Sequence, residues 1–141
     1  MSAEENKARQ RRAFEEVINK GNLDIIPELF APDYFIRSPL GVEAKGPEGF
    51  KQSLAMMRTA FPDLNCTIDD IFAVEDKVAT RFTFTGTLKG EMMGIAPTGK
   101  KFKISGILIT RWVDGKEVEA WEAFDTLTFY QQLGIPIPPG Q

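Results

Sequence analysis

The sequence of 141 residues contains no histidine and a single cysteine. Histidine is the side chain most often used as a base near neutral pH, and it is the most common ligand of transition metals. Its absence excludes Ser-His-Asp and Cys-His triads and leaves a zinc ion only one thiol and carboxylates as ligands. We therefore expect chemistry that uses neither a metal nor another cofactor.

Long apolar runs are also missing. None approaches the roughly 18 to 20 residues that span a bilayer, and residues 1–14 carry charges where a secretory signal has its apolar core. The lone Cys66 cannot form a disulfide within the chain, which agrees with a reducing compartment, and a small buried hydrophobic role is its simplest interpretation. We expect a cytoplasmic protein that does not bind membranes.

An excess of positive charge is the third absence, because the formal net charge is −3. Without a basic surface to neutralise phosphates, nucleic acid is not an expected partner. With 43% hydrophobic and 26% charged residues, the composition is that of an ordinary globular protein. The length fits a single domain over residues 1–141, with loosely ordered tails at about 1–5 and 135–141.

Hydrophobic periodicity predicts helices first and strands afterwards. Apolar spacing predicts helices over about residues 6–20 and 47–61, with a short helix between them that starts just before Pro27 and includes Phe30. A short strand over 33–37 follows that second helix, and alternation begins at Cys66, with a hairpin turn near residues 75–76. The pattern predicts an α+β domain with three N-terminal helices packed on a largely antiparallel sheet of four or five strands.

The dipeptide Asp114-Gly115 is typical of a two-residue type I′ hairpin turn. Its register places Leu108 opposite Trp121 and Ile104 opposite Asp125, so that these residues share one face. The other members of that face are Phe102, Gly106, Ala123 and Leu127. A carboxylate in such surroundings has a raised pKa, because burial disfavours its charged form. We therefore predict that Asp125 is a general acid and base. The alternative is a structural acid that is hydrogen-bonded to the backbone or to a tyrosine such as Tyr34.

The opposite face of this predicted hairpin is apolar as well. Helices and a ligand can cover one face of the sheet, which leaves the second face in need of another cover. We therefore predict a homodimer formed through the outer sheet face. The residues assigned to this face are Ile107, Ile109, Val113, Val118, Ala120 and Phe124.

Several segments together resemble the SnoaL-like polyketide cyclase and ester cyclase family of the nuclear transport factor 2-like superfamily. The segments that carry the resemblance are Asn22-Leu23-Asp24, AFPDL at 60–64, DKVA at 76–79 with Arg81, GTLKGEMMGIAPTGK at 86–100, RWVDGKEVEAWEAFD at 111–125 and Gln132-Leu133-Gly134. The resemblance implies a cone-shaped, strongly curved sheet that encloses a ligand cavity. It also implies ring closure by intramolecular aldol chemistry, without metal or cofactor, with a strand carboxylate as acid and base.

The sequence keeps that carboxylate as Asp125 but departs from the family elsewhere. Relatives often carry a histidine where Leu88 stands, and another near Arg37-Ser38. In the cyclases a histidine on a neighbouring strand assists the carboxylate. The nearest basic residue here is Arg111, which the predicted register places on the opposite face.

Around Asp125 we predict a set of substrate-binding residues. Trp121 either shapes the pocket or is a core aromatic, and Arg81 either holds a substrate carboxylate or enolate or forms an ion pair with Asp70. Glu119 is expected at a solvated rim on the Asp125 face, and Met92 at a flexible pocket lip or over the core. The full predicted set is Trp121, Arg81, Ile104, Leu108, Leu88, Met92 and Tyr34.

These expectations describe a cyclase or isomerase that acts on a small, mostly apolar carbonyl or polyketide-like compound. Asp125 would move a proton at a position next to the carbonyl group. The alternative is a non-catalytic small-molecule-binding protein on the same scaffold, because one fold hosts many functions.

Overall fold

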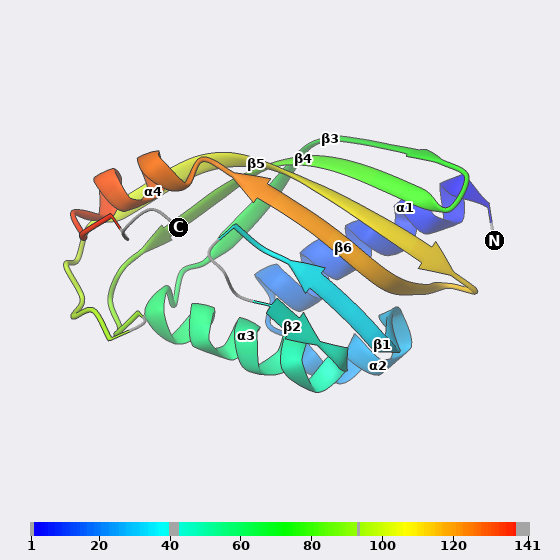
Figure 1. Cartoon of the computed structure of the whole chain (residues 1–141), viewed down its shortest axis with the longest axis horizontal. Helices are drawn as coiled ribbons and strands as arrows, with labels where there is room; N and C mark the ends of the chain where they lie inside the picture. Colours follow the sequence, from blue (N-terminus) through cyan, green and yellow to red (C-terminus); the bar gives the residue numbers. More distant parts are fainter. Residues whose placement is uncertain (1, 40–42, 93, 138–141) are drawn as a thin grey trace.

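A computed structural model describes residues 2–39, 43–92 and 94–137 of the chain. In it, six strands form one open sheet in the order β2-β1-β6-β5-β4-β3 (Figure 1). Neighbouring strands are antiparallel except β1 and β6, which are parallel. The strands are β1 (Phe30–Arg37), β2 (Glu43–Lys45), β3 (Asn65–Val74), β4 (Lys77–Thr87), β5 (Lys101–Val113) and β6 (Lys116–Phe124).

The first helical segment starts earlier than the apolar spacing predicts. Helix α1 (Ala3–Arg12) begins at a capping box in which Ser2 and Glu5 satisfy each other's backbone amides, and it continues as a π-helix over Ala13–Asn19. The prediction of a loosely ordered tail at residues 1–5 is therefore wrong for residues 3–5, which belong to α1. A 3₁₀ turn (Leu23–Ile25) then leads into the short α2 (Ile26–Leu29).

Two helices complete the fold. Helix α3 (Gly46–Ala60) confirms the helix predicted from Pro47 onward. Helix α4 (Thr126–Leu133) was not expected, and it begins at the side chain of Asp125 and ends at Gly134 in a left-handed conformation (φ 69°). The predicted α+β class is confirmed, but three helices and four or five strands become four α-helices and six strands in the described residues.

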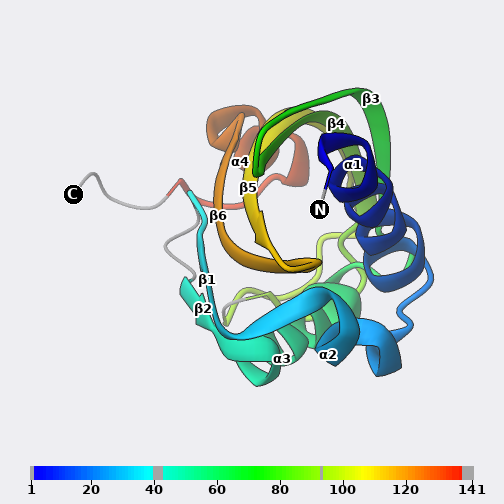
Figure 2. The ribbon, with the colours of Figure 1, turned by 90° about the vertical axis from the view of Figure 1, so that its right-hand side faces the viewer.

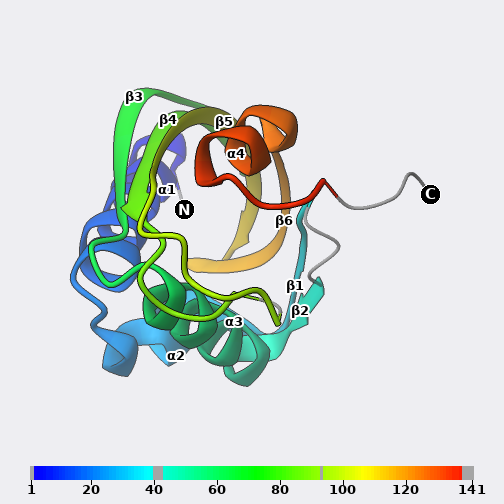
Figure 3. The same ribbon diagram turned by 90° about the vertical axis from the view of Figure 1, so that its left-hand side faces the viewer.

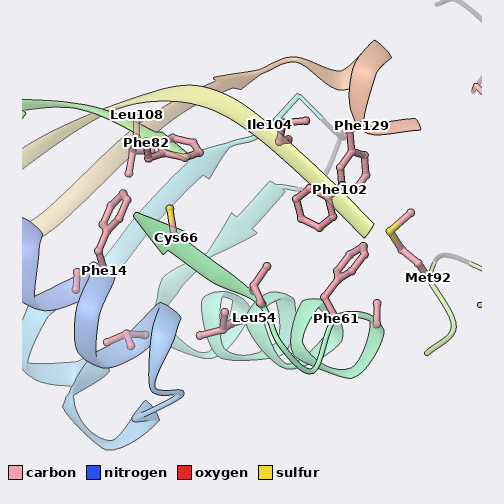
Figure 4. Packing of buried hydrophobic residues seen from close by; sticks show 14 of the residues in the cluster. Phe14, Leu54, Phe61, Cys66, Phe82, Met92, Phe102, Ile104, Leu108 and Phe129 are labelled. Carbon is pink, nitrogen blue, oxygen red and sulfur yellow. The ribbon is translucent and has the colours of Figure 1, made fainter. Parts of the chain in front are cut away.

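The helices lie on one side of the sheet. Helix α1 contacts β3 and β4, whereas α3 contacts β1 and β2 (Figure 2). Helix α4 packs against β5 at the end of the molecule opposite the N-terminus (Figures 1 and 3). Aromatic side chains fill the space between these layers. Phe102 of β5 meets Phe61 and Phe129 at ring-centroid distances of 5.0 and 4.9 Å (Figure 4).

The β5–β6 hairpin departs from the predicted register through a bulge. The turn pairs Val113 with Lys116 as expected, and Trp112 pairs with Glu117, but Arg111 pairs with Glu119. Val118 is thus an extra residue on β6, which shifts every later pair by one position. Leu108 lies opposite Glu122 rather than Trp121, and Gly106 opposite Phe124 rather than Ala123.

Candidate functional site

The bulge decides which acidic residues of β6 face the helices. Glu117 and Glu122 are five positions apart, so in a regular strand they would point to opposite faces. With Val118 inserted between them, both point inward, toward the side covered by the helices. Glu117 is 3% exposed and lies opposite the buried Trp112. Trp121 turns to the outer face opposite Ile109.

A cavity of about 540 Å³ lies between α3, the inner face of the sheet and the loop after β4. Its wall is mostly apolar, and five phenylalanines contribute to it. The polar side chains among its described lining residues are Ser38, Ser53, Thr59, Glu91 and Glu122. The apolar ones are Ile18, Ile36, Phe50, Leu54, Ala55, Met56, Met57, Leu64, Phe84, Met92, Phe102, Ile104, Phe124 and Phe129.

Glu122 is the acid that β6 presents to this cavity. Burial among apolar side chains raises its pKa to about 7, although a hydrogen bond from Ser38 favours the charged form. A carboxyl group with such a pKa interconverts between its protonated and ionised forms near neutral pH, which suits it to act as a general acid or base.

Asp125 lies outside the cavity, at the exposed N-terminus of α4. Its carboxylate accepts hydrogen bonds from the backbone amide of Thr128 at 3.1 Å and from the Thr128 hydroxyl at 2.6 Å. These bonds lower the pKa of Asp125. The predicted pairing with Ile104 and the predicted rise in pKa are both wrong, because the bulge and the helix start move this residue off the inner face. The catalytic role predicted for Asp125 thereby loses its geometric basis.

Two of the predicted substrate-binding residues, Ile104 and Met92, line the cavity. Three others, Leu88, Leu108 and Tyr34, are buried on the inner side of the fold but are not among the cavity-lining residues. These three residues belong to the protein core and do not line the cavity in which we expect the substrate to bind.

The two remaining residues of the predicted set lie on the outer sheet face. Arg81 is exposed and forms an ion pair with Asp69 at 3.9 Å, although its strand partner is Asp70. Trp121 lies under the guanidinium of Arg37, whose central carbon is 5.5 Å from the ring centroid. Neither residue contributes to the cavity wall.

Glu119 faces outward too, contrary to its predicted place on the Asp125 face. Its carboxylate binds Arg111 at 2.9 Å and Arg37 at 3.4 Å, and these partners lower its pKa. The outward position predicted for Arg111 is confirmed.

Sequence reasoning missed Glu117 and Glu122. Glu117 is enclosed beside Tyr34, with which it shares a hydrogen bond, and burial raises its pKa to about 8. One signal for the correct assignment was present. Asp125 and Gly134 stand at the spacing of an N-cap and a C-terminal glycine, which would have removed Asp125 from the strand.

Two further findings concern metals and membranes. Within the described part of the chain, no group of three or more His, Cys, Asp or Glu side chains is arranged to hold a metal ion. The helices of that same part are all too short or too polar to cross a bilayer.

Comparison with known proteins gives a consistent result. A family model described as SnoaL-like polyketide cyclase matches residues 8–133. The chain is 31% identical over 130 residues to the aklanonic acid methyl ester cyclase AcmA of Streptomyces galilaeus, which covers 90% of each protein.

Solved structures agree with this match. IdmH of Streptomyces antibioticus, provisionally assigned as a polyketide cyclase, is 32% identical with a TM-score of 0.79, over 92% of this chain and 99% of IdmH. AclR of Streptomyces galilaeus, provisionally assigned as a hydroxylase, is 32% identical with a TM-score of 0.81, over 98% of this chain and 87% of AclR.

Proposed function

Because this chain belongs to the SnoaL-like polyketide cyclase family, we propose that it closes a ring in a polyketide-like carbonyl compound bound in the cavity. Glu122 acts as the acid and base, in the place that the sequence analysis gave to Asp125. The observation that carries this proposal is the position of Glu122, a single acid of β6 turned into an aromatic-lined cavity with a pKa near neutrality.

The proposed reaction is an intramolecular aldol addition. The ionised Glu122 removes a proton from the carbon next to a carbonyl group, and the electron pair of the broken C–H bond passes into the enolate. The enolate carbon attacks a second carbonyl carbon of the same molecule, which forms the new C–C bond and an alkoxide. Glu122 then returns its proton to the alkoxide oxygen, so the enzyme ends the cycle unchanged.

The apolar cavity wall supports this chemistry in two ways. It holds a long apolar substrate with its reacting carbons close together. The entropy cost of bringing these carbons together is then met when the substrate binds, and it no longer adds to the barrier of the chemical step. It also reduces the hydration of the carboxylate, which raises the pKa of Glu122 and makes it a stronger base than a fully solvated glutamate.

The charge of the cavity wall indicates a neutral substrate. The only charged side chains among its described lining residues are two acids, Glu91 and Glu122. A free carboxylate on the substrate would lose hydration and meet charges of its own sign. AcmA is named for a methyl ester substrate. We therefore propose that this protein, too, takes an esterified polyketide rather than the free acid.

Turnover of matched esters and acids tests this function. We expect ring closure of aklanonic acid methyl ester, the compound for which AcmA is named, when the reaction is monitored by chromatography. We expect at least a tenfold lower kcat/KM for the corresponding free acid. Equal rates for ester and acid would contradict the charge argument. Binding of the esters without any ring closure would instead support a non-catalytic binding protein.

We also propose a homodimer formed through the outer face of the sheet. Ile107, Ile109 and Val113 of β5 and Phe72 of β3 are between 39% and 58% exposed there. Ala120 and Phe124, which the sequence analysis placed on this face, point inward because of the bulge. The remaining apolar surface still suits a second copy of the same chain.

Analytical ultracentrifugation of a charged variant tests the dimer. Ile109→Lys places a charge in the centre of the outer face, and we expect it to sediment as a monomer where the unmodified protein is a dimer. Leu127→Lys is a matched control, because Leu127 is 52% exposed on α4, away from that face. A monomeric unmodified protein at micromolar concentration would contradict the proposal.

A further inference from the structure

We infer that Ser38 is the positioning residue of Glu122: its hydroxyl holds one carboxyl oxygen and leaves the other oxygen to take the substrate proton. This inference rests on the proposed function of Glu122. It concerns a residue that lies just after β1, near the position where relatives often carry a histidine, and to which the sequence alone assigns no role.

The pairing of β1 with β6 brings the two residues together. These strands are parallel, and Ile36 pairs with Ala120 and Arg37 with Trp121. Continuing the register by one residue places Ser38 beside Glu122. Ile36 and Ser38 are two positions apart, so they point to the same side, and both line the cavity with Glu122.

Contacts on the outer face hold this register next to Ser38. The guanidinium carbon of Arg37 lies 4.7 Å from the ring centroid of Phe35 and 5.5 Å from that of Trp121. Arg37 also binds Glu119 of β6 at 3.4 Å. One residue of β1 is thus fixed to two residues of β6, and the next residue, Ser38, is placed at the cavity.

The charges around Glu122 explain why a hydroxyl matters there. Burial raises the pKa of Tyr34 on β1 and of Cys66 on β3, and the nearby charge of Glu122 raises both pKa values further, so each group is neutral at pH 7. Glu91, from the loop after β4, is the other acid of the cavity. The described cavity wall contains no cation. A hydrogen bond from Ser38 therefore counteracts the effect of burial and favours the ionised form of Glu122.

A bond to one oxygen also orients the carboxylate. A glutamate side chain has three rotatable bonds, and an unrestrained carboxylate would sample orientations in which neither oxygen faces the substrate. With one oxygen bound to Ser38, the carboxylate plane is restricted, and the second oxygen is directed at the cavity. This is the usual requirement for a base that must meet a C–H bond at a defined angle.

Ser38→Ala tests the inference through the ionisation of Glu122. Infrared spectroscopy follows the carbonyl stretch of protonated Glu122 as the difference between each protein and its Glu122→Gln counterpart. We expect Ser38→Ala to raise the midpoint of this titration by about one pH unit, because a hydrogen bond to the ionised form is lost. We expect the acidic limb of the kcat/KM profile to move upward by the same amount, and kcat to fall more than KM changes.

Two further variants separate positioning from general effects. Ser38→Thr keeps the hydroxyl, and we expect it to restore the midpoint of the unmodified protein. Ser53→Ala removes a hydroxyl that lines the same cavity from α3, and we expect it to leave the midpoint unchanged. An unmoved midpoint in Ser38→Ala, or an equal shift in Ser53→Ala, would overturn the inference.

The infrared midpoint needs no substrate, so it separates this inference from the proposed function. If Ser38→Ala leaves the midpoint unmoved while Glu122→Gln abolishes turnover, only the role of Ser38 is wrong. If Glu122→Gln retains turnover, the proposed catalytic role of Glu122 is wrong, whatever the midpoint shows.

Discussion

Glu122→Gln is expected to lose ring closure by a factor of about 10² to 10⁴ while the protein stays folded. This is the usual contribution of a positioned general acid or base. Glutamine has nearly the same shape but cannot accept the substrate proton. The thermal midpoint should not fall, because the substitution removes a carboxyl group whose charged form burial disfavours. Single-turnover kinetics with the methyl ester substrate, together with circular dichroism melts, measure both effects.

The matched control for this prediction is Asp125→Asn. Asparagine is as good an N-cap as aspartate, so the start of α4 should be kept. Asp125 lies outside the cavity, and we expect the variant to retain turnover within a few fold. The opposite result, with Asp125→Asn inactive and Glu122→Gln active, would show that Asp125 is the catalytic acid and that Glu122 is not.

Glu117→Gln is expected to stabilise the protein increasingly as the pH rises. The pKa of Glu117 is about 8 in the folded protein, against 4.5 for an unperturbed glutamate. Between these values the folded state keeps a proton that the unfolded state has released, so the free energy of unfolding falls with rising pH and levels off above about 8. The neutral glutamine suffers no such loss and keeps an acceptor for the Tyr34 hydroxyl.

The expected gain relative to the unmodified protein is on the order of 3 kcal/mol between pH 5 and pH 8. Urea unfolding at pH 5, 6.5 and 8 measures it. Glu122 adds a similar but smaller dependence, so part of the slope remains in the variant. A Glu117→Gln protein that shows the full slope of the unmodified protein, or that is less stable at pH 8, would contradict the burial of this acid.

Glu119→Gln is the control of opposite sign. The pKa of Glu119 is lowered by Arg111 and Arg37, so its contribution is present above the unfolded pKa and is lost as the pH falls through the folded pKa. We expect this variant to be slightly less stable than the unmodified protein at neutral pH. Its free energy of unfolding should still fall between pH 5 and 8, because Glu117 is unchanged.

The sequence predicted those parts of the fold that local pattern determines. Pro47 and the apolar stripe after it mark α3, and the turns at Glu75-Asp76 and Asp114-Gly115 appear where they were expected. Each of these features depends on residues within one or two turns of chain. The three-residue β2 has too little pattern to be found, since its pairing with β1 is a tertiary contact.

The candidate site could not be predicted in the same way. A single extra residue at Val118 reverses the facing of all later residues of β6, and nothing in the sequence around Val118 marks a bulge. Because of this extra residue, the acid that faces the cavity is Glu122 and not Asp125. Only the cap pattern from Asp125 to Gly134 could have warned against the assignment, by predicting α4.

An isotope-edited infrared titration of the unmodified protein, with the Glu122→Gln protein as reference, is the most direct test of the bulged register and of the cavity-lining acid that it creates. We expect the carboxyl band assigned to Glu122 to disappear with a midpoint near pH 7. A midpoint near 4.5, the value of a glutamate exposed to water, would contradict it, because Glu122 would then lie outside the cavity.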